Sequence, residues 1–257
     1  MGKPGIAQKK GVMDIIKNWI AHNKQVWLTL YVPAYLTVFC LLQARQVPAR
    51  TVHFALDYQI PFCEYFIIPY CAWYFLLIGV GLYTLLKDKS SFIKFMLFMI
   101  MGYTVCMFVY WVYPIAQDLR PAVFPRDNFC SKLVGLIYSM DPPFNILPSM
   151  HVVGSFMCAA AVANCPTVKK AVSKVLVSLL AVVISISTVF VKQHSVLDTA
   201  AAFALCVIIF FILYAPWTKA QRERISPPAQ RNWLIGGIAG FVVSVLCIRF
   251  TLENLPL

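Results

Sequence analysis

Long apolar runs recur along this chain and limit what it can fold into. A lipid bilayer offers no water to backbone N–H and C=O groups, so a crossing segment must satisfy them internally, as an α-helix does. Such a helix needs about 20 apolar residues, and we expect spans near 27–44, 65–86, 91–113, 149–165, 171–193, 196–217 and 233–251. The sequence predicts an all-α fold, a polytopic membrane helix bundle with a six-span core and one additional C-terminal span.

Composition agrees with a protein whose solvent is largely lipid. Hydrophobic residues make up 60% and charged residues 12% of the 257 residues, proportions typical of multispanning membrane proteins. We divide the chain into a basic, amphipathic cytoplasmic segment (1–26), a six-span catalytic core (27–217), a cytoplasmic linker (218–232) and a last span with a short tail (233–257). The fourth run, which begins at "PSMH", is short for a span.

The basic residues predict the orientation in the membrane. The net charge is +12, but Lys and Arg lie in short loops rather than in a patch interleaved with aromatic residues, so we expect no nucleic-acid partner. In the seven-span arrangement 15 of the 22 fall on the side of the N-terminus. The positive-inside rule puts that side in the cytoplasm. Loops 45–64, 114–148 and 193–196 then face the outside or a lumen.

The location that follows is a multi-pass membrane protein, with the plasma membrane as first choice. A bacterial plasma membrane and a eukaryotic secretory membrane would give similar patterns. No cleavable signal peptide is expected, because the first apolar run begins late and is long enough to span.

Two ionisable residues at the start of the sixth run suggest chemistry. Ionisable groups at membrane depth are expensive and are functional hypotheses by default. Asp198 follows His194 by four residues, so on a helix both side chains share a face. The carboxylate can then accept the Nδ1 proton and leave Nε2 as a nucleophile. A buried pair that only holds two helices together is the alternative.

Neighbouring residues favour a phosphate pocket over that alternative. His151 and Ser149 lie at the beginning of the fourth run, where free backbone N–H groups and the helix dipole attract an anion. Arg120 carries a planar guanidinium suited to phosphate oxygens. Ser187 and Lys192 precede His194 on the same side of the membrane.

Three motifs in this region resemble those of the type 2 phosphatidic acid phosphatase superfamily. That family carries Lys-x6-Arg-Pro, Pro-Ser-Gly-His and Ser-Arg-x5-His-x3-Asp; the chain has "YPIAQDLRP" (113–121), "PSMH" (148–151) and "STVFVKQHSVLD" (187–198). The resemblance implies a six-helix core and a phosphohistidine intermediate. His194 would be the nucleophile, Asp198 would orient it and His151 would protonate the leaving alcohol.

The resemblance also implies how the phosphate is held. Arg120, Ser149 and Ser187 would bind its oxygens, with backbone N–H groups around Met150 and His151. Neither a metal nor a cofactor is implied, because cationic side chains would stabilise the transition state.

Three positions depart from the family pattern: Tyr113 replaces Lys, Met150 replaces Gly and Thr188 replaces Arg. Two cations are therefore missing, as in the branch of inositol phosphorylceramide synthases and, more distantly, sphingomyelin synthases. A diester monoanion needs less neutralising charge than a monoester dianion, so a diester substrate is favoured. Lys192 and Arg126 are candidates to restore the charge, and Asp57 is an accessory candidate for contacting a headgroup.

Three functions remain open at this point. The first is transfer of a phosphate headgroup from a phospholipid to a lipid alcohol at the outer face. The second is a lipid phosphate phosphatase that hydrolyses phosphatidic acid or a polyprenyl diphosphate. The third is a non-catalytic protein that binds or transports anionic lipids.

Overall fold

The computed structural model describes residues 11–45, 50–52 and 54–215, and it is dominated by helices. The long ones are α2 (Tyr31–Ala44), α4 (Ile67–Lys87), α5 (Lys89–Val112), α8 (Ala171–Phe190) and α9 (Val196–Tyr214). Two 3-10 helices precede and extend them: Lys24–Leu30 leads into α2, and Glu64–Phe66 leads into α4. Shorter helices are α1 (Val12–His22), α3 (Ala55–Gln59), α6 (Phe129–Met140) and α7 (Met150–Ala163). Two short strands, β1 (Arg50–Thr51) and β2 (Ile115–Ala116), pair in parallel, so the fold is mostly rather than entirely helical.

Membrane-spanning length is reached by five helices in the described part of the chain. They are Lys24–Ala44, Glu64–Lys87, Lys89–Val112, Ala171–Phe190 and Val196–Tyr214, each beginning and ending close to a predicted span. The prediction of a membrane helix bundle is confirmed at this level. The fourth predicted span is the 14-residue helix α7, which is too short to count among the five. The seventh span, the linker 218–232 and the tail lie outside the described residues.

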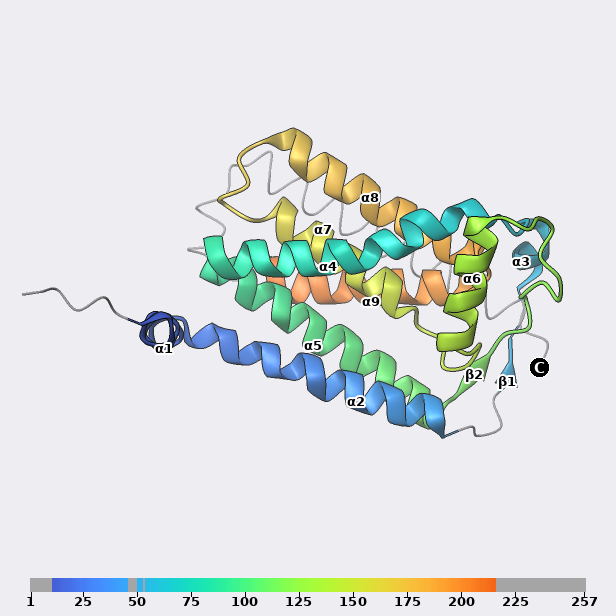
Figure 1. Cartoon of the computed structure of the whole chain (residues 1–257), viewed down its shortest axis with the longest axis horizontal. Coiled ribbons are helices and arrows are strands. Elements are labelled where there is room, and N and C mark those ends of the chain that lie inside the picture. Colours follow the sequence, from blue (N-terminus) through green and yellow to red (C-terminus); the bar gives the residue numbers. More distant parts are fainter. Residues whose placement is uncertain (1–10, 46–49, 53, 216–257) are drawn as a thin grey trace, which may run out of the picture.

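Helix α7 forms the centre of the bundle. It packs against α4, α5, α8 and α9, and most of its side chains are buried (Figure 1). Glycines allow the close approach: an added Cβ at Gly102 of α5 would lie 2.6 Å from Val153 Cγ1 of α7. At Gly154 of α7 an added Cβ would lie 2.6 Å from the Tyr103 hydroxyl and 2.8 Å from Nε1 of Trp73. A short helix surrounded by longer ones is therefore packed through small residues.

Polar caps place the helix ends. Asp88 accepts the backbone N–H of Ser91 at the start of α5, and Asn128 accepts that of Ser131 at the start of α6. Ser149 caps α7 and Ser195 caps α9. Each cap satisfies one of the N–H groups that a helix leaves unpaired in its first turn.

The ends of α2, α5 and α8 and the starts of α4, α7 and α9 lie at one end of the bundle, on the right in Figure 1. The β1–β2 pair, α3 and α6 cover this end. The sequence predicts a proline-rich loop at 114–148, whereas the structure contains α6 within it. We refer to this end as the site end, because the three motifs meet there.

The segment that precedes the first span forms the amphipathic helix α1. Its apolar residues Val12, Met13, Ile15 and Ile16 are exposed. Figure 1 shows α1 end-on, at a steep angle to α2. Such a helix can lie in the plane of the membrane interface.

Candidate active site

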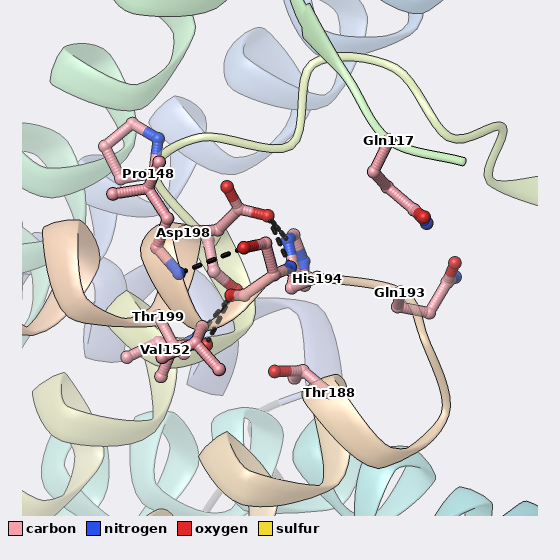
Figure 2. Close-up of polar contacts among 12 residues, drawn as sticks. Gln117, Pro148, Val152, Thr188, Gln193, His194, Asp198 and Thr199 are labelled. Atoms are coloured by element: carbon pink, nitrogen blue, oxygen red, sulfur yellow. Dashed lines mark hydrogen bonds and ion pairs between the residues drawn. The ribbon is translucent and has the colours of Figure 1, made fainter. Parts of the chain in front are cut away.

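His194 and Asp198 face each other at the start of α9. The Nδ1 atom of His194 lies 3.5 Å from Oδ2 of Asp198, and both side chains are almost fully buried (Figure 2). That distance exceeds a normal N–H···O hydrogen bond, although catalytic contacts often tighten only when substrate binds. The pairing of imidazole and carboxylate predicted from the sequence is present as a contact. With Nδ1 directed at Asp198, Nε2 is the nitrogen left for chemistry.

The expectation that one helix carries both residues was wrong. Helix α9 begins at Val196, and His194 lies in the turn that joins it to α8. The reason is local, because Ser195 caps the helix and Asp198 returns the bond by accepting the Ser195 N–H at 2.8 Å. This capping box stops the helix from extending back to His194. The backbone carbonyl of Thr188 accepts the N–H groups of Gln193 and His194 and closes the turn.

Asp57 of α3 supports the same turn from behind. One carboxylate oxygen accepts the hydroxyl of Ser195 at 2.6 Å, and the other accepts the N–H of Val196 at 2.8 Å. Lys192, which has a left-handed backbone (φ 53°), donates from Nζ to the carbonyls of Asp57 and Ile60. Burial lowers the pKa of Lys192, and the nearby Asp57 acts in the opposite direction. Both residues thus hold the His194 turn in place, whereas the sequence suggested contacts with phosphate or headgroup.

His151 lies in the first turn of α7, between aromatic rings. Its ring centroid is 4.4 Å from that of Tyr70 and 4.3 Å from that of Trp73. Nε2 of His151 has no hydrogen-bond partner among the described residues. The preceding turn is fixed because the Tyr110 hydroxyl donates to the carbonyl of Pro148 at 2.6 Å. His151 is therefore held by stacking, with a ring nitrogen still available.

The two histidines come together although the chain separates them by 43 positions. Their ring centroids are 6.0 Å apart, and the N–H of Ser149 donates to the carbonyl of Asp198, which ties the start of α7 to α9. At that distance both imidazoles can contact one phosphate group. Ser149 is buried and its hydroxyl accepts the N–H of Val152 at 3.4 Å.

Arg120 reaches the same region from the loop after β2. Its guanidinium stacks over the Tyr138 ring at 4.2 Å and donates to the carbonyl of Asp141 at 2.7 Å and to the side-chain oxygen of Gln193. Gln193 immediately precedes the nucleophile candidate. Burial lowers the pKa of Arg120, but a guanidinium stays charged at any physiological pH. Arg120 is thus a fixed positive charge beside His194.

The other predicted site residues divide into two groups. Met150 lies at the first position of α7, beside His151. In α8, the Ser187 hydroxyl donates to the carbonyl of Ile184, and the Thr188 hydroxyl donates to the carbonyl of Ser185. Tyr113 and Arg126 are engaged elsewhere: Tyr113 accepts from Arg50, and Arg126 forms a bidentate pair with Glu64 at 2.5 and 2.8 Å. Arg126 and Lys192, the proposed replacement cations, therefore both have protein partners.

An apolar cavity of about 610 Å³ opens onto the two histidines. Helices α2, α4 and α5 contribute most of its wall, including Tyr35, Phe39, Leu77 and Phe95. His151, His194, Gln193, Asp141, Asn145 and Gln43 line its polar end. A cavity that is apolar along most of its wall and ends in imidazoles suits a molecule with a hydrocarbon chain and a polar head.

Several residues at this end were not anticipated. Asp141 caps the end of α6, Gln193 binds Arg120, and Tyr70 and Trp73 hold His151. Burial raises the pKa of the Asp141 carboxyl, and His194, Arg120 and Gln43 act in the opposite direction. No spacing rule marks these positions in the sequence, because their roles depend on which loops meet at the site end.

Within the described residues, no three or more His, Cys, Asp or Glu side chains gather as a metal site. Comparison of the chain with protein-family models, with curated proteins and with solved structures found no match.

Proposed function

We propose that this protein is a membrane enzyme that transfers a phosphate ester group between lipids through a phosphohistidine on His194, in the manner of the type 2 phosphatidic acid phosphatase superfamily. The observation that carries the proposal is the position of His194 and His151, 6.0 Å apart at the polar end of an apolar cavity. Asp198 behind His194 and Arg120 beside it complete the set of groups that this chemistry needs.

In the first half of the reaction, Nε2 of His194 attacks phosphorus and the bond from phosphorus to the leaving oxygen breaks. His151 donates a proton to that oxygen, so a neutral alcohol leaves. Asp198 stabilises the charge that develops on His194, as a carboxylate does behind an imidazole. Arg120 and the N–H groups at the start of α7 would neutralise the phosphate oxygens.

In the second half, an acceptor hydroxyl attacks the phosphohistidine. The bond between phosphorus and Nε2 breaks, a new phosphate ester forms, and His151 takes the acceptor's proton. When the acceptor is a lipid alcohol the enzyme is a transferase, and when it is water the enzyme is a phosphatase. The proton balance is the same in both cases.

Charge favours a phosphodiester donor. The charge of Arg126 is neutralised by Glu64, and Lys192 donates to the carbonyls of Asp57 and Ile60. Arg120 also donates to backbone carbonyls, but it reaches Gln193 beside His194, so we assign the phosphate to Arg120. One guanidinium with two imidazoles suits a monoanion better than a dianion. We therefore place transfer of a phosphate headgroup to a lipid alcohol first. Hydrolysis of a lipid phosphate is the alternative, and the experiment below distinguishes the two by their products.

The test uses purified protein and its His194→Ala variant in the presence of a chelator. Labelled phosphatidic acid and phosphatidylinositol are supplied with ceramide or diacylglycerol, and the products are identified. A new phosphorylated lipid made only by the wild type supports a transferase. Release of free phosphate without such a lipid supports a phosphatase. If His194→Ala turns over the lipids as the wild type does, or if neither protein forms a product, the phosphohistidine mechanism is rejected.

A further inference from the structure

Asp141 is a carboxylate at the polar end of the cavity that the mechanism above does not use. One of its oxygens, Oδ1, accepts the side-chain N–H of Gln43 at 3.1 Å. The other, Oδ2, accepts no hydrogen bond from the described residues, and Asp141 lines the cavity together with His194. The carboxylate is thus anchored at one oxygen and available to a ligand at the other.

The anchor is itself held in one orientation. Asn145 donates from Nδ2 to the side-chain oxygen of Gln43 at 2.9 Å and to the carbonyl of Leu42 at 3.3 Å. Because that oxygen of Gln43 is occupied, its NH₂ group is the part directed at Asp141. Asn145 is buried and has a left-handed backbone (φ 56°), a conformation that asparagine tolerates better than most residues. The series Asn145, Gln43, Asp141 therefore joins α2 to the loop after α6 and fixes the carboxylate.

Asp141 is poorly suited to binding the phosphate itself. A carboxylate repels a phosphate oxygen and can only accept hydrogen bonds. The group that it binds must therefore be a hydrogen-bond donor. Arg120 and His194 lie near enough to interact electrostatically with Asp141, so the site already contains positive charge and a neutral donor suffices. An alcohol hydroxyl satisfies this requirement.

The position of Asp141 shows which hydroxyl it would bind. No ion-pair contact joins Asp141 to His194 within the described chain, where His194 pairs with Asp198. Asp141 is thus next to the reacting centre and not in contact with it, and it faces the same cavity as Gln43 and Asn145. A hydroxyl bound there is therefore a second one, separate from the oxygen that reacts at His194.

We propose that Asp141, oriented by Gln43 and Asn145, binds a second hydroxyl of the substrate, so that the enzyme selects lipids in which a free hydroxyl neighbours the reacting oxygen. Monoacylglycerols as acceptors and lysophospholipids as donors share this chemistry, whereas the second hydroxyl of ceramide lies one carbon further from the reacting oxygen. The inference rests on the proposed function for its reacting oxygen. Asp141 acts on selection, while His194 forms and breaks the bond to phosphorus and His151 transfers the proton.

Binding tests the proposal without requiring turnover. Labelled 1-monooleoylglycerol, which has two neighbouring hydroxyls, is compared with oleyl alcohol, which has the same chain length and one hydroxyl. Wild-type protein is expected to bind monooleoylglycerol about tenfold more tightly, the effect of a hydrogen bond to a charged acceptor. Asp141→Asn keeps an oxygen for Gln43 but presents an NH₂ group to the cavity, so it should remove this preference and leave oleyl alcohol binding within about threefold.

Two further variants separate selection from damage to the fold. Gln43→Leu removes the anchor of Asp141 and is expected to weaken monooleoylglycerol binding in the same direction but by less. Asp127→Asn removes an exposed carboxylate of the loop before α6 that pairs only with Lys132 among the described residues, and this variant should bind both probes like the wild type. The proposal is overturned if the wild type shows no preference, or if Asp141→Asn weakens both probes equally.

Turnover then identifies the source of the hydroxyl. A preference for monooleoylglycerol over oleyl alcohol as acceptor, lost in Asp141→Asn, places the bound hydroxyl on the acceptor. A preference for lysophosphatidic acid over oleyl phosphate as donor, lost in the same variant, places it on the donor. Selective binding without any turnover would reject the proposed function and retain the subsite. Turnover that depends on His194 but does not depend on the second hydroxyl would support the proposed function and reject the subsite at Asp141.

Discussion

Oδ2 of Asp198 lies 3.5 Å from Nδ1 of His194 and 2.8 Å from the backbone nitrogen of Ser195. One oxygen therefore closes the capping box of α9 and faces the imidazole in front of it. Because the cap fixes the carboxylate, the His194 ring has a stationary partner. The start of a helix is used here to orient a side chain that lies outside the helix.

Replacing Asp198 with asparagine tests this relationship. The side chain keeps its shape, and its amide oxygen can still accept the Ser195 N–H, but it loses the negative charge that stabilises a protonated His194. We expect lipid turnover to fall by about a hundredfold or more, in the range of general acid–base effects, with little loss of thermal stability. Asp127→Asn, which removes an exposed carboxylate, is the matched control. Equal rates for Asp198→Asn and wild type would contradict the role of Asp198.

Asp57 should matter for both stability and catalysis. It accepts the Ser195 hydroxyl and the Val196 N–H, so Asp57→Ala removes contacts that place the His194 turn. Loss of a helix cap costs about 0.5–2 kcal/mol. Asp88→Ala removes a comparable cap from α5 at the opposite end of the bundle, where Asp88 accepts the Ser91 N–H at 2.7 Å.

We therefore expect both alanine variants to lower the melting temperature and only Asp57→Ala to lower the rate at saturating lipid as well. Calorimetry and initial rates on the same preparations measure the two effects. A rate loss in Asp88→Ala as large as that in Asp57→Ala would show that destabilisation alone explains it.

Gly154 tests the aromatic support of His151. A methyl group at this position would lie 2.6 Å from the Tyr103 hydroxyl and 2.8 Å from Nε1 of Trp73, whose ring contacts that of His151. Overpacking of this kind costs about 1–3 kcal/mol, and displacement of Trp73 would disturb His151. Gly154→Ala is expected to lose stability and activity, whereas Gly79→Ala, where nothing lies within 4 Å of the added Cβ, should lose neither. Activity and melting temperature of the two variants provide the measurement.

The spans could be predicted because hydrophobicity acts locally along the chain. The runs 91–113 and 171–193 end within three residues of the helices Lys89–Val112 and Ala171–Phe190. Helix α6 escaped prediction because it is short and surrounded by prolines, and its burial depends on contacts with α4. Its formation is decided by tertiary packing more than by a pattern in its own residues.

The candidate site was predictable only where motif spacing placed residues next to one another. The pairing of His194 with Asp198 was expected from their separation, although the turn before α9 and not a shared helix brings it about. The approach of His151 was expected only from the resemblance. Lys192 was expected at the phosphate, but a left-handed backbone and the carbonyls of Asp57 and Ile60 give it a structural role. Asp141 carried no signal, because its importance comes from Gln43, which is 98 residues away.

The stability of the protein should depend on the ionisation of Asp141. Burial raises its pKa, while the surrounding His194, Arg120 and Gln43 oppose the shift. Tyr70, Tyr74 and Tyr110 also interact with it electrostatically. Between the ordinary aspartate pKa, about 3.9, and the raised value, the folded state holds a proton that the unfolded state releases. Stability therefore falls as pH rises through this window.

Asp141→Asn cannot ionise and should escape this penalty. We expect the variant to melt at a higher temperature than the wild type at pH 7, and the difference to shrink as the pH is lowered towards 3.9. Melting curves of both proteins in detergent across this range measure the effect. A variant less stable at pH 7 than the wild type would show that the charged carboxylate stabilises the fold. A stabilised variant with impaired lipid selection would fit a residue retained for function at the expense of stability.

Orientation in the membrane decides from which leaflet lipids reach the candidate site. Basic residues predict that the site end faces outside, and Val123, which is 82% exposed in the loop before α6, is a suitable position for a probe. Lys169, exposed in the connection between α7 and α8, is the matched position at the opposite end. In a cysteine-reduced background, Val123→Cys in intact cells is expected to react with an impermeant thiol reagent, and Lys169→Cys only after permeabilisation. The opposite pattern would place the histidines at the cytoplasmic surface, where the substrates would have to come from the inner leaflet.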